Sequence, residues 1–148
     1  MTNLIGKVLK DRRGASAAEF AILIPVFGTM LFGIIKFGIL YNNYLSLTSA
    51  VANAERQFAV SRTTTTPYSS ATTVLYNSAP TLAHGSLTVT TYVAGTACAT
   101  DAACTTSLST ASGSTSQVTA SYPCDLVIMG VNFATGCTLK AQATERVE

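Results

Sequence analysis

An almost uninterrupted apolar run from Phe20 to Tyr41 constrains the fold of this chain more than any other feature. The run has 22 residues, and a helix needs roughly 20 to cross the hydrocarbon core of a bilayer. It therefore predicts one transmembrane helix near the N-terminus. The sequence is compatible with a helix from residue 15 to about residue 61, so we expect this helix to extend well beyond the membrane.

The charges around the run predict its orientation. Four basic residues and one acid precede it: Lys7, Lys10, Arg12, Arg13 and Asp11. Because basic flanks stay on the cytoplasmic side, we expect a cytoplasmic N-terminus and export of the residues after about 42.

A secretory signal peptide is the competing interpretation, with a small-residue cleavage site at Ala50–Ala52. The apolar region of such a signal has roughly 7 to 15 residues, which is shorter than this run. The polar stretch 42–49 also separates the run from that site. Conventional cleavage is therefore disfavoured.

The remaining residues, 62–148, suit one small exported domain. Without residues 1–14, five basic and six acidic side chains remain, a net charge of −1. No basic stripe is left that would attract nucleic acid, so we expect no nucleic-acid partner. The predicted fold class is α+β, with a long N-terminal helix packed on a small antiparallel β-sheet.

All four cysteines lie in the predicted exported domain, where disulfides form readily: Cys98, Cys104, Cys124 and Cys137. Three pairings are possible and the sequence does not choose among them. Pairing Cys98 with Cys104 and Cys124 with Cys137 closes the shortest loops. A zinc site is disfavoured because the chain has no Cys-x-x-Cys pair and His84 is its only histidine. We expect no metal and no cofactor.

The long helix has two features that bear on packing. Pro25 removes one backbone hydrogen bond, so we expect a kink or local loosening near residues 21–25. Further along, five residues recur at steps of three and four and form one stripe: Tyr44, Leu47, Val51, Ala54 and Phe58. The stripe needs a partner surface, and the protein's own sheet is favoured over a coiled coil because the pattern barely exceeds two heptads.

Within the exported domain, threonines and a proline at 63–67 are expected to end the helix. A short second helix is predicted at 68–78. The strand predictions are 86–93, 117–122 and 138–147, and 94–116 is predicted to be a long loop. The apolar segment 126–129 is compatible with either a short strand or an exposed partner-binding loop.

The junction before the apolar run combines a basic leader, Gly14, Glu19 and Phe20. This is the layout that a type IV prepilin peptidase processes, with cleavage between Gly14 and Ala15. Residues 1–14 would then be a leader. A carboxylate at the edge of an apolar helix is costly unless it is paired or protonated. We expect Glu19 to pair with the Ala15 ammonium of an adjacent subunit, and an interaction with its own helix N-terminus is the alternative.

Lys36 lies 17 residues beyond Glu19, roughly 25 Å along a regular helix. It therefore approaches the outer membrane interface. Snorkelling of its ammonium to the headgroups is favoured over an intersubunit pair with Glu19. Because Gly-x-Ser-x-Gly and phosphate-binding glycine loops are missing from the sequence, we expect no enzymatic activity, and His84 is expected in a surface turn.

Three segments carry a resemblance to a known family, the TadE-like pilus-assembly proteins. They are Arg12–Pro25, Leu31-Phe32-Gly33-Ile34-Ile35 with Phe37-Gly38, and the final residues Ala143–Glu148. The resemblance is concentrated in the N-terminal third. It implies a minor pilin or pseudopilin of a tight-adherence (Tad or Flp) type IV pilus system, with a priming or tip role.

The resemblance also implies partners, location and residue roles. The partners would be a prepilin peptidase, other pilin subunits and, before assembly, the bacterial inner membrane; a surface ligand is not identified. Gly14 and Ala15 would carry processing, and Glu19, Phe20 and Pro25 would carry assembly into a pilus at the cell surface. The family often has an acidic residue where Lys36 stands. The alternatives are a main filament-forming pilin and an uncleaved single-pass anchor with an extracytoplasmic binding domain.

Overall fold

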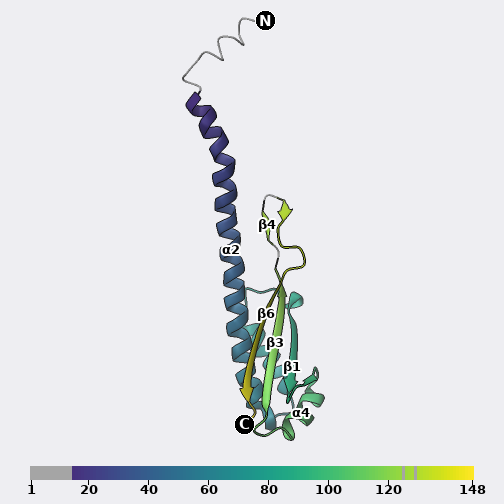
Figure 1. The fold of residues 1–148 in the computed structure, drawn as a ribbon. Coiled ribbons are helices and arrows are strands. Elements are labelled where there is room, and N and C mark those ends of the chain that lie inside the picture. Colours follow the sequence, from purple (N-terminus) through teal and green to yellow (C-terminus); the bar gives the residue numbers. More distant parts are fainter. Residues whose placement is uncertain (1–14, 125, 129) are drawn as a thin grey trace, which may run out of the picture.

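One long helix, α2 (Ala15–Ala59), dominates the computed structural model and projects from a small domain formed by the rest of the chain (Figure 1). The structure describes residues 15–124, 126–128 and 130–148, with side chains from residue 17 onward. The helix is continuous through Pro25, so the expected loosening there does not interrupt it. It ends two residues earlier than predicted and is followed by a 3₁₀ turn, η2 (Ser61–Thr63).

The C-terminal part of α2 supplies one wall of the hydrophobic core. Leu47, Val51, Ala54 and Phe58 are fully buried, whereas Tyr44 at the start of the predicted stripe is 42% exposed. The stripe contacts α3 (Pro67–Ser78) and two sheet strands, β3 (Thr115–Pro123) and β6 (Thr138–Arg146). The prediction that the stripe packs on the protein's own domain is therefore confirmed.

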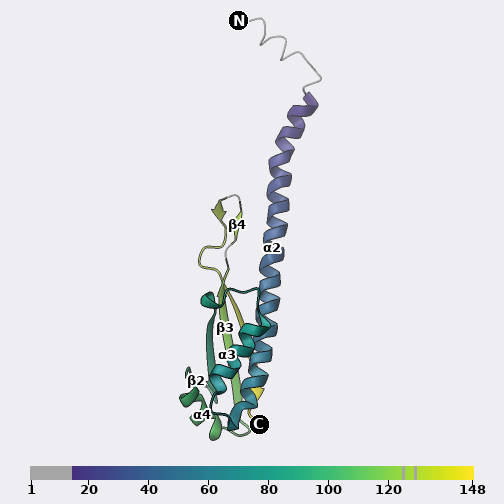
Figure 2. The same cartoon turned by 180° about the vertical axis from the view of Figure 1, so that it is seen from behind.

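The sheet has four antiparallel strands in the order β2 (Thr96–Cys98), β1 (Thr88–Val93), β3 and β6. In register, Val118 of β3 lies opposite Thr91 of β1 and Ala143 of β6. Strand β3 is therefore central, and its inward side chains Val118 and Ala120 are fully buried. Helix α3 lies beside the lower part of α2 (Figure 2). The predicted α+β class and the three predicted strands are confirmed.

The prediction of a long loop over residues 94–116 is wrong. That segment contains β2, a helix α4 (Asp101–Ser109) and the first residues of β3. Thr100 caps α4 by accepting a hydrogen bond from the backbone N–H of Ala103 at 3.3 Å. Leu108 is fully buried, so tertiary packing stabilises the helix. The Ser- and Thr-rich sequence of the segment did not predict this packing.

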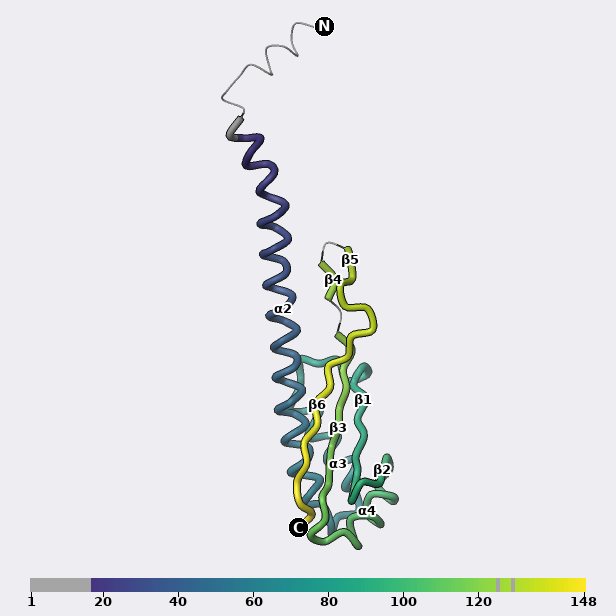
Figure 3. The backbone as a smooth tube through the Cα atoms, in the orientation of Figure 1, coloured from purple at the N-terminus to yellow at the C-terminus, as the bar shows by residue number. Residues whose placement is uncertain are grey.

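The apolar segment at 126–129 forms part of a separate hairpin. Its described strands are β4 (Val127–Ile128) and β5 (Val131–Asn132), which pair antiparallel. Of the two possibilities left open by the sequence, the structure therefore contains the strand. The hairpin extends past the four-stranded sheet and runs beside α2 toward its N-terminal half (Figure 3).

Two cysteine pairs lie at disulfide distance. Cys98 is bonded to Cys104, and Cys124 is bonded to Cys137, with Cα atoms 5.2 Å apart in both pairs. The first pair joins β2 to α4 and is buried in the core. The second closes the base of the β4–β5 hairpin, where the backbone N–H of Cys124 also donates to the carbonyl of Cys137 at 3.1 Å. The structure thus contains the pairing that closes the shortest loops.

Candidate assembly helix and processing junction

The N-terminal half of α2 is an apolar surface that the rest of the chain leaves largely uncovered. Large apolar side chains from Phe20 to Ile39 are between 48% and 71% exposed. Among the described residues, α2 is the helix that is long enough and apolar enough to cross a membrane. Its most apolar window has a mean hydropathy of 2.1. An exposed apolar surface of this extent marks contact with lipid or with other proteins.

The processing junction lies at the edge of what the structure describes. Gly14 is outside the described residues, and Ala15 is the first residue of α2. Glu19 and Phe20 follow in the second turn, and both side chains are exposed. Two of the three predicted assembly residues, Glu19 and Phe20, therefore lie exposed near a free helix end, where a neighbouring molecule can reach them.

Pro25 and Lys36 occupy different surroundings on the same helix. Near Pro25, the Thr29 hydroxyl donates to the carbonyls of Pro25 and Val26 at 3.0 and 2.9 Å. Lys36 lies where the free helix meets the domain, and it lines a pocket of about 200 Å³ together with Asn43 and Tyr122. Its expected position at the membrane interface remains a prediction.

Glu55 is a site residue that the sequence analysis missed. It is fully buried between α2 and the sheet, and its Oε1 accepts a hydrogen bond from the Ser116 hydroxyl of β3 at 2.5 Å. Its Oε2 has no hydrogen-bond partner among the described residues. Burial raises the pKa of Glu55 to about 7, against the opposing effect of the Ser116 hydrogen bond. A buried carboxyl group therefore titrates near neutral pH at the joint between helix and sheet.

A sequence signal for Glu55 does exist. It follows Val51 by four residues and precedes Phe58 by three, so it lies on the helix face that carries the buried stripe. Periodicity analysis of apolar residues passes over such an acid because it counts only apolar side chains. A carboxyl group within an apolar stripe is the pattern that would have identified it.

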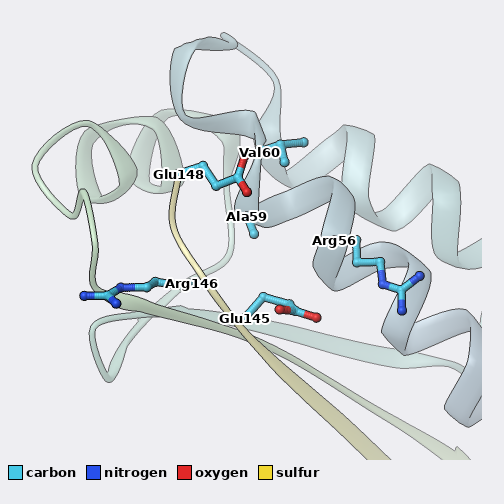
Figure 4. A pocket seen from close by; sticks show the side chains of 6 residues that line it. All are labelled: Arg56, Ala59, Val60, Glu145, Arg146 and Glu148. Atoms are coloured by element: carbon cyan, nitrogen blue, oxygen red, sulfur yellow. The ribbon is translucent and has the colours of Figure 1, made fainter.

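A second polar site lies at the other end of the domain. A pocket of about 230 Å³ forms between the end of α2 and the end of β6, lined by Arg56, Ala59, Val60, Glu145, Arg146 and Glu148. Figure 4 shows Glu145 extending toward Arg56, whereas Arg146 points away from both. Arg146 instead donates from Nε to the carbonyl of Gly113 at 2.7 Å. This hydrogen bond joins the end of β6 to the residues just before β3.

His84 and the possible metal ligands were the other residues considered for a chemical role. His84 is exposed in a short 3₁₀ helix, η3 (His84–Ser86), and its ring stacks on Tyr76 with ring centroids 4.7 Å apart. Within the described ranges, no group of three or more His, Cys, Asp or Glu residues is arranged to hold a metal ion.

Comparison with known families agrees with this emphasis on the helix. Residues 14–56 match the family model described as TadE-like protein, a structural, pilin-like family of Tad pilus systems. No curated protein and no solved structure matches the chain. The match covers the junction and nearly all of α2, and it ends at Arg56, just before the last turn of the helix. Residues 14–56, which form nearly all of the long N-terminal helix, are therefore TadE-like.

Proposed function

We propose that this chain is a minor pilin or pseudopilin of a Tad-type pilus, processed after Gly14 and assembled through α2. The observation that carries the proposal is the exposed apolar N-terminal half of α2, which lies within the segment that matches the TadE-like model. In the precursor, the bilayer would cover this surface. In the assembled state, apolar helices of other pilin subunits would replace the lipid.

Glu19 supplies a means of aligning subunits in this proposal. Cleavage after Gly14 leaves an ammonium group on Ala15, four residues before Glu19. A salt bridge from Glu19 to the Ala15 ammonium of a neighbour would offset the two helices by about one turn, or about 5.4 Å. Within an apolar bundle the carboxylate is strongly destabilised without such a partner, so correctly aligned subunits are favoured.

Processing is tested by intact mass. The full chain is expressed with its prepilin peptidase, extracted from membranes and measured by mass spectrometry. We expect the native chain to lack residues 1–14, and Gly14→Val to retain them because a bulky side chain obstructs the peptidase cleft. Gly6→Val is the matched control, since it places the same change inside the leader and leaves cleavage intact. Retention of the leader by the native chain would favour the uncleaved anchor.

Assembly is tested separately from processing. We expect Glu19→Gln to be cleaved normally but recovered in sheared pili at no more than about a tenth of the native level, because one lost salt bridge of about 1.4 kcal/mol is a factor of ten. Glu148→Gln removes an exposed acid far from the helix N-terminus and should assemble like the native chain. Normal incorporation of Glu19→Gln would contradict the role assigned to Glu19.

A further inference from the structure

The β4–β5 hairpin lies beside the part of α2 that is predicted to span the membrane (Figure 3). An open apolar cleft separates the two, and its lining residues are Val26, Thr29, Met30, Ile128, Val131 and Phe133. The base of the hairpin lies further along the helix, because Cys124 and Lys36 line a different pocket. The hairpin therefore runs from the level of Lys36 toward the N-terminal end of α2.

Charges at both ends of the apolar run fix its depth in a bilayer. Arg13 precedes the first residue of α2 by two positions, and Lys36 lies 21 residues after that first residue. These 21 residues span about 32 Å along a helix, and the hydrocarbon core of a bilayer is about 30 Å thick. A shift of α2 by two helical turns would bring one of the charges into the core, which is costly. The run therefore has little freedom to slide, whichever end faces the cytoplasm.

This depth places the cleft inside the hydrocarbon region. Met30 and Val26 precede Lys36 by six and ten residues, which corresponds to about 9 Å and about 15 Å along the helix. The hairpin residues that line the cleft with them lie at the same level. When α2 spans a bilayer, a hairpin in this position would reach from the boundary at Lys36 to about the middle of the core.

The backbone of the hairpin is unsuited to that environment. Strands β4 and β5 form a two-stranded sheet joined by two residue pairs, so within the described residues the outer edge of each strand has no neighbour. Hydrocarbon offers no hydrogen-bond partner to such an edge, which is why open sheet edges do not occur in contact with lipid. The side chain of Asn132 is also exposed. The hairpin and a bilayer therefore compete for the same stretch of α2.

Little burial holds the outer part of the hairpin in place. Val131 and Phe133 are 57% and 66% exposed, whereas Leu126 near the base is only 8% exposed. The base itself is closed by the disulfide between Cys124 and Cys137. The outer part can therefore move away from α2 as a unit while its base stays attached to the sheet.

We propose that the β4–β5 hairpin is displaced from α2 while the helix spans a membrane, and that it takes its place beside Val26 and Met30 only after α2 leaves the bilayer. The proposal rests on the membrane-anchored precursor of the proposed function and adds a conformational change to its assembly step. The hairpin would then shield part of the apolar helix that the lipid has vacated.

The test is a distance measurement by pulsed electron paramagnetic resonance on the full chain. Spin labels are attached to Leu31→Cys and Asn132→Cys, two exposed positions outside the cleft lining, and the four native cysteines are disulfide-bonded and do not react. We expect a short distance in amphipol, a charged polymer that lacks a continuous hydrocarbon layer. In phospholipid nanodiscs the distance should be longer. Labels at Thr48→Cys and Gln142→Cys, on the buried part of α2 and on β6, should give the same distance in both media.

An equal Leu31–Asn132 distance in the two media would overturn the proposal. A short distance in both would show that the hairpin stays beside α2 within the bilayer, and a long distance in both would show that it does not occupy this position in the extracted chain.

A substitution in the cleft tests the contact itself. Ile128→Ser should lower the ratio of short to long distances in amphipol about fivefold, which corresponds to about 1 kcal/mol, because Ile128 lines the cleft and is half-buried. Val127→Ser is the matched control, since Val127 is the neighbouring strand residue but does not line the cleft. An equal effect of the two substitutions would contradict docking through the cleft.

Accessibility to a water-soluble nickel chelate gives an independent measurement in nanodiscs. A single label at Asn132→Cys should collide with the chelate, whereas a single label at Leu31→Cys should be protected by lipid. Equal protection of both labels would place the hairpin in the hydrocarbon and overturn the proposal. Neither measurement involves the peptidase or a pilus. Failure here therefore leaves the proposed processing and assembly intact, and retention of the leader in the processing test leaves the hairpin displacement intact.

Discussion

At the scale of single residues, Glu55 is the most unusual group in the domain. Its carboxyl is fully buried, with one oxygen bonded to Ser116 and the other without a partner among the described residues. Burial raises its pKa from an ordinary value of 4.5 to about 7, against the lowering effect of the Ser116 hydrogen bond. The protonated form is therefore the one that the fold accommodates best.

This pKa predicts how stability depends on pH. Between pH 4.5 and about 7 the folded chain holds a proton that the unfolded chain has lost, so the free energy of unfolding falls as the pH rises. The loss is at most about 3.5 kcal/mol, because one pKa unit corresponds to about 1.4 kcal/mol. We expect Glu55→Gln to abolish this decline. Urea unfolding in detergent micelles, followed by near-UV circular dichroism of the six tyrosines, measures it.

Glu145→Gln provides the control for this prediction. Glu145 is exposed and lies outside the buried pair of Glu55 and Ser116, so the decline with pH should persist. A decline that is equally steep in Glu55→Gln and in the native chain would show that Glu55 is not its source.

At the scale of elements, α2 is one helix with two different environments. From Leu47 onward one face of α2 is buried against the sheet and α3, whereas the part before it is exposed and largely apolar. The helical segment is continuous, so a change in burial rather than a break in secondary structure separates the two. Phenylalanines in the two parts therefore make different contributions to stability.

We expect Phe58→Ala to lower the free energy of unfolding of the domain by about 3 to 5 kcal/mol, because Phe58 is fully buried and its removal leaves a cavity. Phe32→Ala is the matched change in the free half, where the side chain is 55% exposed. It should leave the domain unfolding transition unchanged within about 0.5 kcal/mol. Equal losses in the two variants would contradict the division of α2 into a core half and a free half.

At the scale of the whole molecule, the two disulfides act on different regions. Cys98 and Cys104 are buried in the core, where the hydroxyl of the buried Thr91 contacts both sulfurs. The Cys124–Cys137 bond instead closes the hairpin beside the free half of α2. Loss of the first bond should destabilise the domain, and loss of the second should loosen mainly the hairpin.

Hydrogen exchange followed by mass spectrometry distinguishes these effects. In Cys124→Ser/Cys137→Ser, we expect protection to fall in peptides covering 126–133 while peptides covering β3 and β6 stay protected. In Cys98→Ser/Cys104→Ser, the melting temperature of the whole domain should fall, because a disulfide typically contributes about 2 to 4 kcal/mol. An unchanged melting temperature in the core variant, or loss of β3 protection in the hairpin variant, would contradict this assignment.

The sequence alone determined the features that depend on local pattern. The apolar run, the stripe from Leu47 to Phe58 and the three main strands were predicted because residue periodicity reports secondary structure and burial directly. The junction at Gly14 and Glu19 was likewise a short linear motif. It remains a prediction, because Gly14 lies outside the described residues and a single chain does not show a subunit interface.

The tertiary structure decided the features that depend on residues far apart in the chain. Asp101 in α4 accepts hydrogen bonds from the backbone and hydroxyl of Ser69, at the start of α3 and 32 positions away. Ser116 meets Glu55 across 61 positions. The cysteine pairing and the position of the hairpin beside α2 also follow from the packing of the domain. No local pattern encodes such contacts, because they form only when the sheet has closed onto the helix.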